Sequence, residues 1–271
     1  MKSFDNKVAV VTGAASGIGQ ALVVELAKRG ALLAYCDVAD MTTTNEKVQP
    51  FGRETLAATV DIGSKPEIEA FRDRVIQHFG RAELLVNNAG IALGERTFEE
   101  ATPEDFERIT NINYWGVVHT TQMFYPCLLE QAEAAIVNLS SAQGVLAAPY
   151  LVPYCTTKFA VRGFTDALRT EHKIRGIDNV SVHCVHPGAV ATDITLNADY
   201  QGVNSRRFHE QLQVGTSPEK AAGEILEGVL KSNSRIFIGD GVWNDRLARL
   251  LPKHYYHVIR WVMKRQGVAV R

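Results

Sequence analysis

The sequence predicts an α/β fold in which helices cover both faces of one doubly wound parallel sheet of about seven strands. Short apolar runs of strand length alternate along the chain with longer stretches in which apolar residues recur at helical spacing. The short runs are apolar throughout, as in strands that are buried on both faces. No linker rich in Pro, Gly or Ser divides the chain and no internal repeat is present, so one domain is expected.

Each element is placed by its own pattern. Strands are expected at the short apolar runs Val8–Val11, Ala31–Tyr35, Leu56–Val60, Leu84–Val86, Ala135–Leu139, Val180–Val185 and Arg235–Ile238. Helices are expected where apolar residues recur with the helical period, at residues 17–29, 65–79, 103–128, 154–175 and 218–231. Gly80 and Gly176 directly follow two of these stretches and are typical residues after a helix end.

Length and composition exclude several classes of protein. Of the 271 residues, 46% are hydrophobic and 22% charged, as in globular rather than disordered proteins. The net charge of -1 gives no basic excess for a nucleic acid, and no apolar run approaches the ~20 residues of a transmembrane helix. The first residues lack the apolar stretch of a signal peptide, and the 4 cysteines are too far apart for a zinc ribbon. A cytoplasmic location is therefore expected.

A glycine-rich turn, Thr12-Gly13-Ala14-Ala15-Ser16-Gly17-Ile18-Gly19, follows the first predicted strand. Glycines permit a tight turn, let backbone N–H groups approach a pyrophosphate and let the next helix pack closely on its strand. The spacing is Gly-x-x-x-Gly-x-Gly rather than Gly-x-Gly-x-x-Gly, so a plain structural turn remains an alternative. The turn nevertheless predicts a dinucleotide-binding domain of the Rossmann type over residues 1–240.

An acidic residue, Asp37, stands at the end of the second predicted strand, about 20 residues beyond the turn. Its carboxylate can accept a hydrogen bond from an adenosine ribose 2′-hydroxyl and would repel a 2′-phosphate. Neither Val38 nor Ala39 supplies a positive charge. We therefore predict that NAD is preferred to NADP as cofactor; the alternative is that Asp37 only caps a turn.

Four polar residues further along suggest a reaction centre. Tyr154 and Lys158 lie four positions apart near the start of a predicted helix, so their side chains share one face. Ser141 follows the fifth predicted strand, at the carboxyl edge of the sheet where ligands bind. Asn113 lies inside a predicted helix although Asn has poor helix propensity. The topology of a parallel sheet is expected to bring these side chains toward one pocket.

The chain resembles the short-chain dehydrogenase/reductase family over residues 6–240. Thr12–Gly19 resembles its cofactor turn, Asp61-Ile62 its adenine contact and Asn87-Asn88-Ala89-Gly90 its Asn-Asn-Ala-Gly motif. Asn113, Ser141, Tyr154 and Lys158 stand where the family carries its catalytic residues, and Pro187-Gly188 with Thr192 resembles its nicotinamide-side loop. The resemblance implies cofactor contacts from Gly13, Ser16, Gly17, Ile18, Gly19, Asp37, Asp61, Ile62, Asn88, Ala89, Gly90, Tyr154, Lys158, Pro187, Gly188, Val190 and Thr192.

The resemblance implies an NAD-dependent oxidoreductase that interconverts a secondary alcohol and a ketone by hydride transfer. Tyr154 acts in this expectation as general acid/base, Lys158 lowers the tyrosine pKa and binds the nicotinamide ribose, and Ser141 holds the substrate oxygen. Asn113 is expected to hold a water that links Lys158 to solvent. Lowering a tyrosine pKa from near 10 by two to three units requires about 3–4 kcal/mol, and one ammonium at about 4 Å supplies roughly that amount.

Two other activities remain open at this stage. An epimerase or dehydratase could use the same Tyr and Lys without net change in NADH, and a dinucleotide-sensing protein could use the fold without catalysis. The family resemblance also implies a homodimer or homotetramer, formed through the helices that carry Asn113 and Tyr154. His183 and His186 are three positions apart without a third ligand nearby, so no metal site is expected. His186 is better interpreted as the end of a strand than as a catalytic imidazole.

Apolar residues near the expected site predict a largely apolar substrate. One wall is expected from Val145, Leu146, Tyr150, Leu151 and Val152, and a second wall or lid from residues 193–215, which contain Leu196, Tyr200, Phe208 and Leu212.

Residues 241–271 form a basic amphipathic extension with seven Lys or Arg against one acid, Asp245, whereas the whole chain has a net charge of -1. Its apolar stripe, interrupted at Pro252, consists of Leu247, Leu250, Leu251, Tyr255, Val258, Ile259 and Val262. We expect this stripe to pack on the domain or on a neighbouring subunit; contact with an anionic membrane surface is the alternative.

Overall fold

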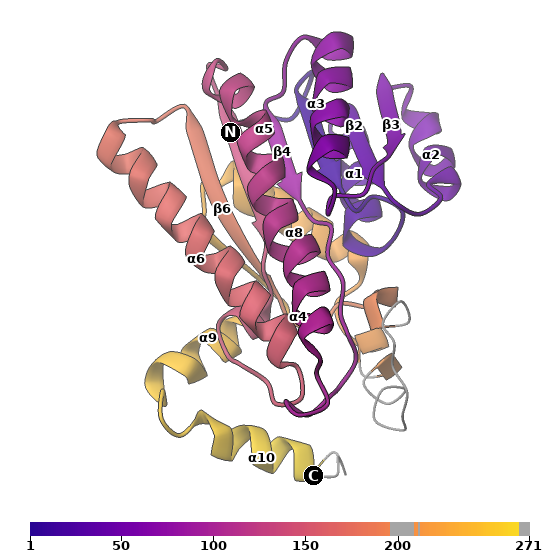
Figure 1. Cartoon of the computed structure of the whole chain (residues 1–271). Coiled ribbons are helices and arrows are strands. Elements are labelled where there is room, and N and C mark those ends of the chain that lie inside the picture. The colour runs from indigo at the N-terminus through magenta and orange to yellow at the C-terminus, as the bar shows by residue number, and fades with distance from the viewer. Residues whose placement is uncertain (196–208, 211, 266–271) are drawn as a thin grey trace.

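The computed structural model describes residues 1–195, 209–210 and 212–265. Within these residues, seven parallel strands form one sheet in the order β3-β2-β1-β4-β5-β6-β7 (Figure 1). The strands are β1 (Val8–Thr12), β2 (Leu32–Asp37), β3 (Thr55–Thr59), β4 (Leu84–Asn87), β5 (Ala134–Leu139), β6 (Val180–Pro187) and β7 (Arg235–Ile238). The predicted doubly wound α/β fold is therefore confirmed.

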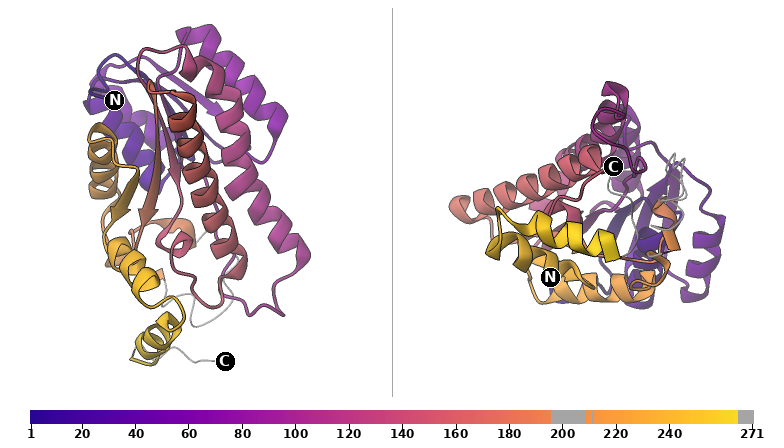
Figure 2. Two further views of the ribbon diagram at one scale, coloured as in Figure 1. Left: turned by 90° about the vertical axis from the view of Figure 1, so that its left-hand side faces the viewer. Right: turned by 90° about the horizontal axis from the view of Figure 1, so that it is seen from below.

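Helices cover both faces of this sheet, as Figures 1 and 2 show. The helices α1 (Gly17–Lys28) and α8 (Pro218–Leu230) pack together on one face. The other face carries α3 (Lys65–Phe79), α5 (Gly116–Leu129) and α6 (Val152–Arg175). This two-sided cover explains why the strand sequences are predominantly apolar. The buried Asn87 of β4 and Asn138 of β5 are exceptions, and their side chains are hydrogen-bonded to each other at 2.8 Å.

Alternate residues of the strands supply the two halves of the core. Val8 and Val10 of β1 point into the cluster that contains Phe124 of α5. Val11, like Ala9, points to the opposite face and packs in the other cluster with Leu22 of α1. Successive side chains of a strand point to opposite faces, so each strand contributes to both clusters. The sheet is thereby fixed rigidly between its two helix layers.

Two helical features differ from the sequence prediction. The expected helix over 103–128 is divided into α4 (Pro103–Thr110), a π-helical turn at Asn111–Trp115, and α5. A capping box between Thr102 and Asp105 fixes the start of α4. The helix α2 (Thr42–Val48) was not predicted, because its sequence is mostly polar and buries only Thr44 and Val48.

The chain reverses direction across the sheet between β1 and β4. From β1 it adds β2 and β3 on one side, and from β4 it adds β5, β6 and β7 on the other. Such a switch point leaves a crevice at the carboxyl ends of the strands. The glycine-rich turn follows β1 and the Asn87–Gly90 segment follows β4, so both reach this crevice.

The C-terminal extension forms two helices, α9 (Gly241–Leu250) and α10 (Tyr255–Arg265). They are separated around Pro252, where the sequence predicted an interruption. The helix α9 lies against β7 and against a short helix at Ala142–Gly144, whereas α10 has no buried residue. No helix in the described part of the chain has the length and hydrophobicity needed to cross a membrane.

Candidate active site

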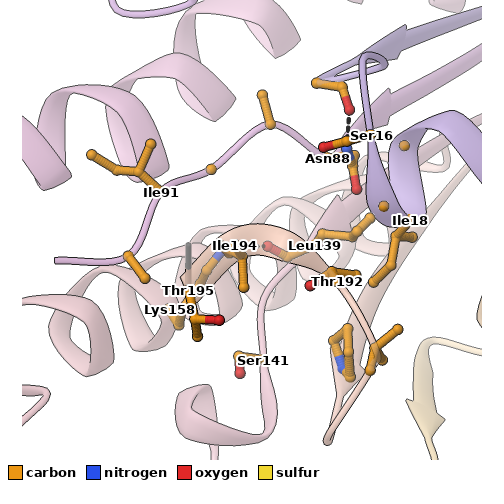
Figure 3. Close-up of a pocket in the computed structure, with 18 of the residues that line it drawn as sticks. Ser16, Ile18, Asn88, Ile91, Leu139, Ser141, Lys158, Thr192, Ile194 and Thr195 are labelled. Atoms are coloured by element: carbon orange, nitrogen blue, oxygen red, sulfur yellow. Dashed lines mark hydrogen bonds between the residues drawn. The ribbon is translucent and has the colours of Figure 1, made fainter. Parts of the chain in front are cut away.

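One cavity of about 840 Å³ lies at the carboxyl ends of the strands. All seventeen residues expected to contact a cofactor line it, together with Ser141. Figure 3 shows Ser16 and Ile18 of the glycine-rich turn at one end, and Ser141 and Lys158 toward the other. Residues from widely separated parts of the chain therefore share one continuous pocket.

The glycine-rich turn is shaped by close backbone contacts. A Cβ on Gly19 would lie 1.9 Å from the carbonyl oxygen of Gly13, and one on Gly13 would lie 2.6 Å from Cα of Ala89. Gly13 also has a positive φ of 71°, which L side chains rarely adopt. These positions exclude side chains for steric reasons, and α1 begins within the turn, at Gly17. Its free N–H groups make this end of the cavity suitable for phosphate oxygens.

The Asn-Asn-Ala-Gly segment holds the turn in place. The side-chain amide of Asn88 donates to the carbonyl oxygens of Thr12 and Gly13, each at 2.9 Å. The Thr12 hydroxyl accepts the backbone N–H groups of Asn88 and Ala89, each at 3.1 Å. The segment after β4 is thus bound to the turn after β1, and the crevice between the strands keeps a fixed width.

Asp37 closes the other side of the turn. Its carboxylate accepts the N–H of Ala15 at 2.9 Å and the N–H of Ala39 at 3.0 Å. The side chain is half-buried and lines the cavity. Among the described lining residues, Lys158 is the only Lys or Arg, and it comes from a different part of the pocket wall. The Asp37 region therefore presents negative charge to a ligand.

Ser141, Tyr154 and Lys158 come together from β5 and α6. Ser141 directly follows β5, and its hydroxyl donates to the Gln143 side-chain oxygen at 2.6 Å. Tyr154 and Lys158 lie in the first two turns of α6, and Lys158 Nζ is 5.6 Å from the centre of the Tyr154 ring. Lys158 is 5% exposed and donates to the carbonyl oxygen of Leu139 at 3.0 Å. Pro153 occupies the first turn of α6. Proline is favourable there because a backbone N–H at this position would have no acceptor within the helix.

Burial determines the protonation states of this group. It raises the pKa of Tyr154 to about 12, against the lowering effect of a hydrogen bond with Ser141. Burial also lowers the pKa of Lys158 to about 8. The expected lowering of the tyrosine pKa by Lys158 is thus not seen with the chain's own residues, because loss of hydration disfavours the phenolate more than its neighbours favour it. At neutral pH Tyr154 is a neutral phenol and Lys158 is largely protonated.

Asn113 does not line the cavity but supports its wall from the π-helical turn. Its amide group donates to the Ile91 carbonyl oxygen at 3.0 Å and accepts the Ile91 N–H at 2.8 Å. A Cβ on Gly90 would lie 3.2 Å from the Asn113 oxygen and 3.3 Å from Lys158 Nζ, so both groups approach this glycine. Asn113 lies in the π-helical turn, and it joins this turn to Ile91 in the loop after β4. Single π-helical turns inside α-helices are frequent at functional sites. The expected role of Asn113 in holding a water stays a prediction.

Asp240 and Asn244 are among the lining residues that sequence reasoning missed. Asp240 precedes α9 and accepts the N–H of Ala189 at 3.1 Å, beside Pro187-Gly188. A Cβ on Gly188 would lie 1.7 Å from the same Asp240 oxygen. The sequence offered no signal for this approach, because the two segments are distant in the chain and meet only where β6 and β7 end side by side.

The expected apolar walls are only partly present. Of the first set, Leu151 lines the cavity, Val145 and Leu146 are buried, and Val152 is 36% exposed. Of this predicted wall only Leu151 therefore lines the cavity, and Val145, Leu146, Tyr150 and Val152 do not. Of the second set, Leu212 lines the cavity, whereas Leu196, Tyr200 and Phe208 lie outside the described residues. Ile91 and Ile194 supply further apolar contacts.

His186 lies in the core rather than in the cavity. It is fully buried, its Nδ1 is 3.1 Å from the Ser141 carbonyl oxygen, and its ring stacks on Phe237 with centres 5.1 Å apart. Burial lowers its pKa to about 4, so the imidazole is neutral at physiological pH. The interpretation of His186 as the end of a strand agrees with this position. Among the described residues no group of His, Cys, Asp or Glu is arranged to hold a metal ion.

Comparison with known proteins now assigns the family. The profile of the family described as short chain dehydrogenase matches residues 7–201. The chain belongs to this family. A relative from Mycobacterium tuberculosis, "Putative oxidoreductase SadH", is 36% identical over 266 residues, or 96% of each chain. The short-chain dehydrogenase resemblance is therefore confirmed, and the chain is an oxidoreductase of this family.

Two solved structures of family members match the fold closely. A short chain dehydrogenase/reductase from Burkholderia phymatum, in complex with NAD, is 27% identical with a TM-score of 0.86, over 93% of this chain and 96% of the other. An alcohol dehydrogenase from the archaeon Thermococcus sibiricus, complexed with 5-hydroxy-NADP, is 26% identical with a TM-score of 0.72, over 87% and 97%. Both likenesses agree with a short-chain dehydrogenase fold over nearly the whole chain.

Proposed function

We propose that this short-chain dehydrogenase uses NAD to interconvert a secondary alcohol and a ketone, with Tyr154 as general acid/base. One observation carries the proposal. Ser141, Tyr154 and Lys158 line the same cavity as the glycine-rich turn and Asp37. A group that can transfer a proton thus shares a pocket with a phosphate-binding turn, which is what a hydride transfer to or from a dinucleotide requires.

The residues of the cavity fit a nicotinamide dinucleotide. Gly13 and Gly19 leave backbone exposed for a pyrophosphate, and the N-terminus of α1 favours its negative charge. Asp37 would bind the adenosine ribose hydroxyls and repel a 2′-phosphate, which supports NAD over NADP. The relative from Burkholderia phymatum binds NAD, and the one from Thermococcus sibiricus binds an NADP analogue. When bound, the nicotinamide supplies or accepts the hydride.

The protonation state of Tyr154 suits donation to a ketone oxygen. With a pKa of about 12, the phenol holds its proton at neutral pH and can release it to an alkoxide that develops in the cavity. The Ser141 hydroxyl is placed to donate to the same oxygen once it leaves Gln143. Lys158, whose positive charge lies near the Tyr154 ring, stabilises the phenolate that remains.

Alcohol oxidation uses the same groups in reverse. Tyr154 must first lose its proton, which at neutral pH is unfavourable with a pKa of about 12. A bound oxidised nicotinamide would add its positive charge to that of Lys158 and would lower this cost. The Lys158 pKa of about 8 allows it to give up a proton to solvent at mildly alkaline pH. Asn113, which fixes the Ile91 backbone beside Lys158, would position a water for this exchange.

The proposed substrate is largely apolar with one secondary alcohol or ketone. Ile91, Leu151, Ile194 and Leu212 give the cavity apolar contacts. Asp240, Asn244 and Gln143 add polar groups along its wall, which can orient a second polar group on the substrate.

A coupled assay tests the proposal. The purified protein is screened with NAD and secondary alcohols that include sterols, retinoids, hydroxy-fatty acyl compounds and short diols, with NADH absorbance as the readout. NADH formation that Tyr154→Phe abolishes is the expected result. Tight NADH binding without turnover on any alcohol or ketone would instead indicate a dinucleotide sensor. Product formation without net NADH change would indicate an epimerase or dehydratase.

A further inference from the structure

The helices α9 and α10, residues 241–265, are called here the C-terminal helical pair. This pair carries a concentration of exposed hydrophobic side chains: Trp243 (65% exposed), Leu250 (77%), Leu251 (41%), Tyr256 (54%), Trp261 (55%) and Val262 (37%). In Figure 1 and in the left view of Figure 2, α10 projects from the end of the molecule where α4 lies. Exposed hydrophobic surface of this kind marks an interaction site.

The same surface is strongly basic. The pair contains six Lys or Arg and one acid, Asp245, which already pairs with Arg249 at 2.8 Å. The other five basic side chains form no ion pair with the described residues. Arg246 lies over the Trp243 ring at 5.0 Å, and Arg265 lies over the Trp261 ring at 4.4 Å. Each tryptophan is thus exposed next to a cation that has no carboxylate partner among these residues.

The helix α10 separates apolar and basic faces. Tyr255, Val258, Ile259 and Val262 recur at three- and four-residue spacing and share one face, on which Val262 is exposed and the other three side chains are half-buried. Arg260 and Lys264 are exposed and lie four positions apart on the opposite side. A helix with this division can lie in a membrane interface, with its apolar face in the acyl boundary and its long basic side chains at lipid phosphates. Tryptophan and tyrosine are the residues enriched at that depth.

We propose that the C-terminal helical pair docks this protein on the surface of an anionic lipid bilayer. Charge favours this occupant over a second copy of the chain. A twofold interface with its axis at the helical pair would bring this basic surface against itself, so unpaired cations would face one another. A bilayer supplies phosphates and anionic headgroups for them instead.

The charge of the remaining chain supports one orientation on the bilayer. Residues 241–271 are basic while the whole chain has a net charge of -1, so the preceding residues carry a net negative charge. The bilayer would repel that body and attract the helical pair. Asn244 of α9 lines the cavity, so docking places the cavity close to the lipid. Access to substrates dissolved in the bilayer rests on the proposed function, whereas the docking itself does not.

Vesicle binding by the full chain tests the docking without any substrate. The vesicles are phosphatidylcholine with about one-third phosphatidylserine, and vesicles of phosphatidylcholine alone serve as reference. Binding is measured by co-sedimentation and by the blue shift of tryptophan fluorescence. Each basic side chain near an anionic surface strengthens binding about fivefold, so Arg260→Gln/Lys264→Gln is expected to weaken it about 25-fold. Raised salt should weaken it further, because the charges are exposed.

The matched control is Arg74→Gln/Lys173→Gln, which removes two exposed basic residues from α3 and from the C-terminal end of α6. It should bind anionic vesicles like the unmodified chain. NADH titration of each variant verifies that the fold is intact. The proposal is overturned if the protein ignores anionic vesicles or if both double variants bind equally. It is also overturned if Arg260→Gln/Lys264→Gln changes the oligomer mass in sedimentation velocity without changing vesicle binding.

Discussion

Replacement of Tyr154 by Phe removes one hydroxyl group from the centre of the cavity. Burial raises the pKa of that hydroxyl to about 12, so the phenol keeps its proton at neutral pH. General acid–base catalysis by a positioned side chain contributes about 10²–10⁴-fold, which corresponds to ~3–5 kcal/mol of barrier. Tyr154→Phe is therefore expected to lower turnover by this factor in both directions. The loss of one hydrogen bond should change the free energy of unfolding by only about 1 kcal/mol.

The pH dependence provides an independent check on the role of Tyr154. Because the phenol is neutral at pH 7, alcohol oxidation should accelerate about tenfold per pH unit as more phenolate forms. Ketone reduction needs the protonated phenol and should stay constant until Lys158, with a pKa of about 8, loses its charge. Both rates are measured as kcat/KM from NADH absorbance between about pH 6 and pH 9.

A matched tyrosine variant separates the loss of catalysis from a general effect. Tyr256→Phe removes a hydroxyl from the exposed surface of α10 and should leave turnover unchanged. NADH affinity of Tyr154→Phe should stay near that of the unmodified protein. If Tyr154→Phe kept more than about a tenth of the turnover, the assignment of general acid/base to this residue would be refuted.

Asp37→Ser removes the carboxylate that faces the cavity, so NADH affinity should fall about tenfold and discrimination against NADPH should disappear in fluorescence titration; an unchanged preference would contradict the role of Asp37. Lys158→Met tests the burial of the ammonium. In the folded protein the Lys158 pKa is about 8, below its usual value, so above about pH 8 the unfolded chain binds more protons than the folded one. The free energy of unfolding of the unmodified protein should therefore rise with pH, and Lys158→Met should abolish this rise. The gain relative to the variant approaches ~3 kcal/mol by about pH 10 in urea unfolding, and parallel pH profiles would show that the ammonium is not buried. Gln143→Leu frees the Ser141 hydroxyl from its acceptor at 2.6 Å and should lower KM for a ketone about fivefold with little change in kcat; an increased KM would show that the amide itself binds substrate.

Local patterns predicted most of the fold because they reflect local physics. The runs of β1 and β5 are buried on both faces, so their residues are mostly apolar, and the Asn138 amide of β5 is tolerated there because it is hydrogen-bonded. The helix α2 shows the limit of this approach. It is stabilised by hydrogen bonds such as the one that the Thr44 hydroxyl donates to the Ala14 carbonyl oxygen. A helix held by a few such bonds has no apolar periodicity from which it could be predicted.

In the candidate site, too, some features were predictable from local sequence and others depend on contacts between distant segments. Spacing placed Tyr154 and Lys158 on one helical face, and strand order placed Ser141 at the same edge. The approach of Asp240 to Gly188 depends on the pairing of β6 with β7, which are joined by a long segment of chain. Such a contact depends on packing between distant segments, so no local sequence pattern predicts it.

The amino-acid sequence by itself determined the element types, the glycine-rich turn and the residues able to carry a reaction. It did so because helix and strand periods, and the steric need for glycine, act within a few neighbouring positions. Only the tertiary structure decided that burial raises the Tyr154 pKa, that Val145 is buried without lining the cavity and that α10 has no buried residue. Hydration and packing are properties of the surroundings of a side chain, and those surroundings exist only once distant segments have come together.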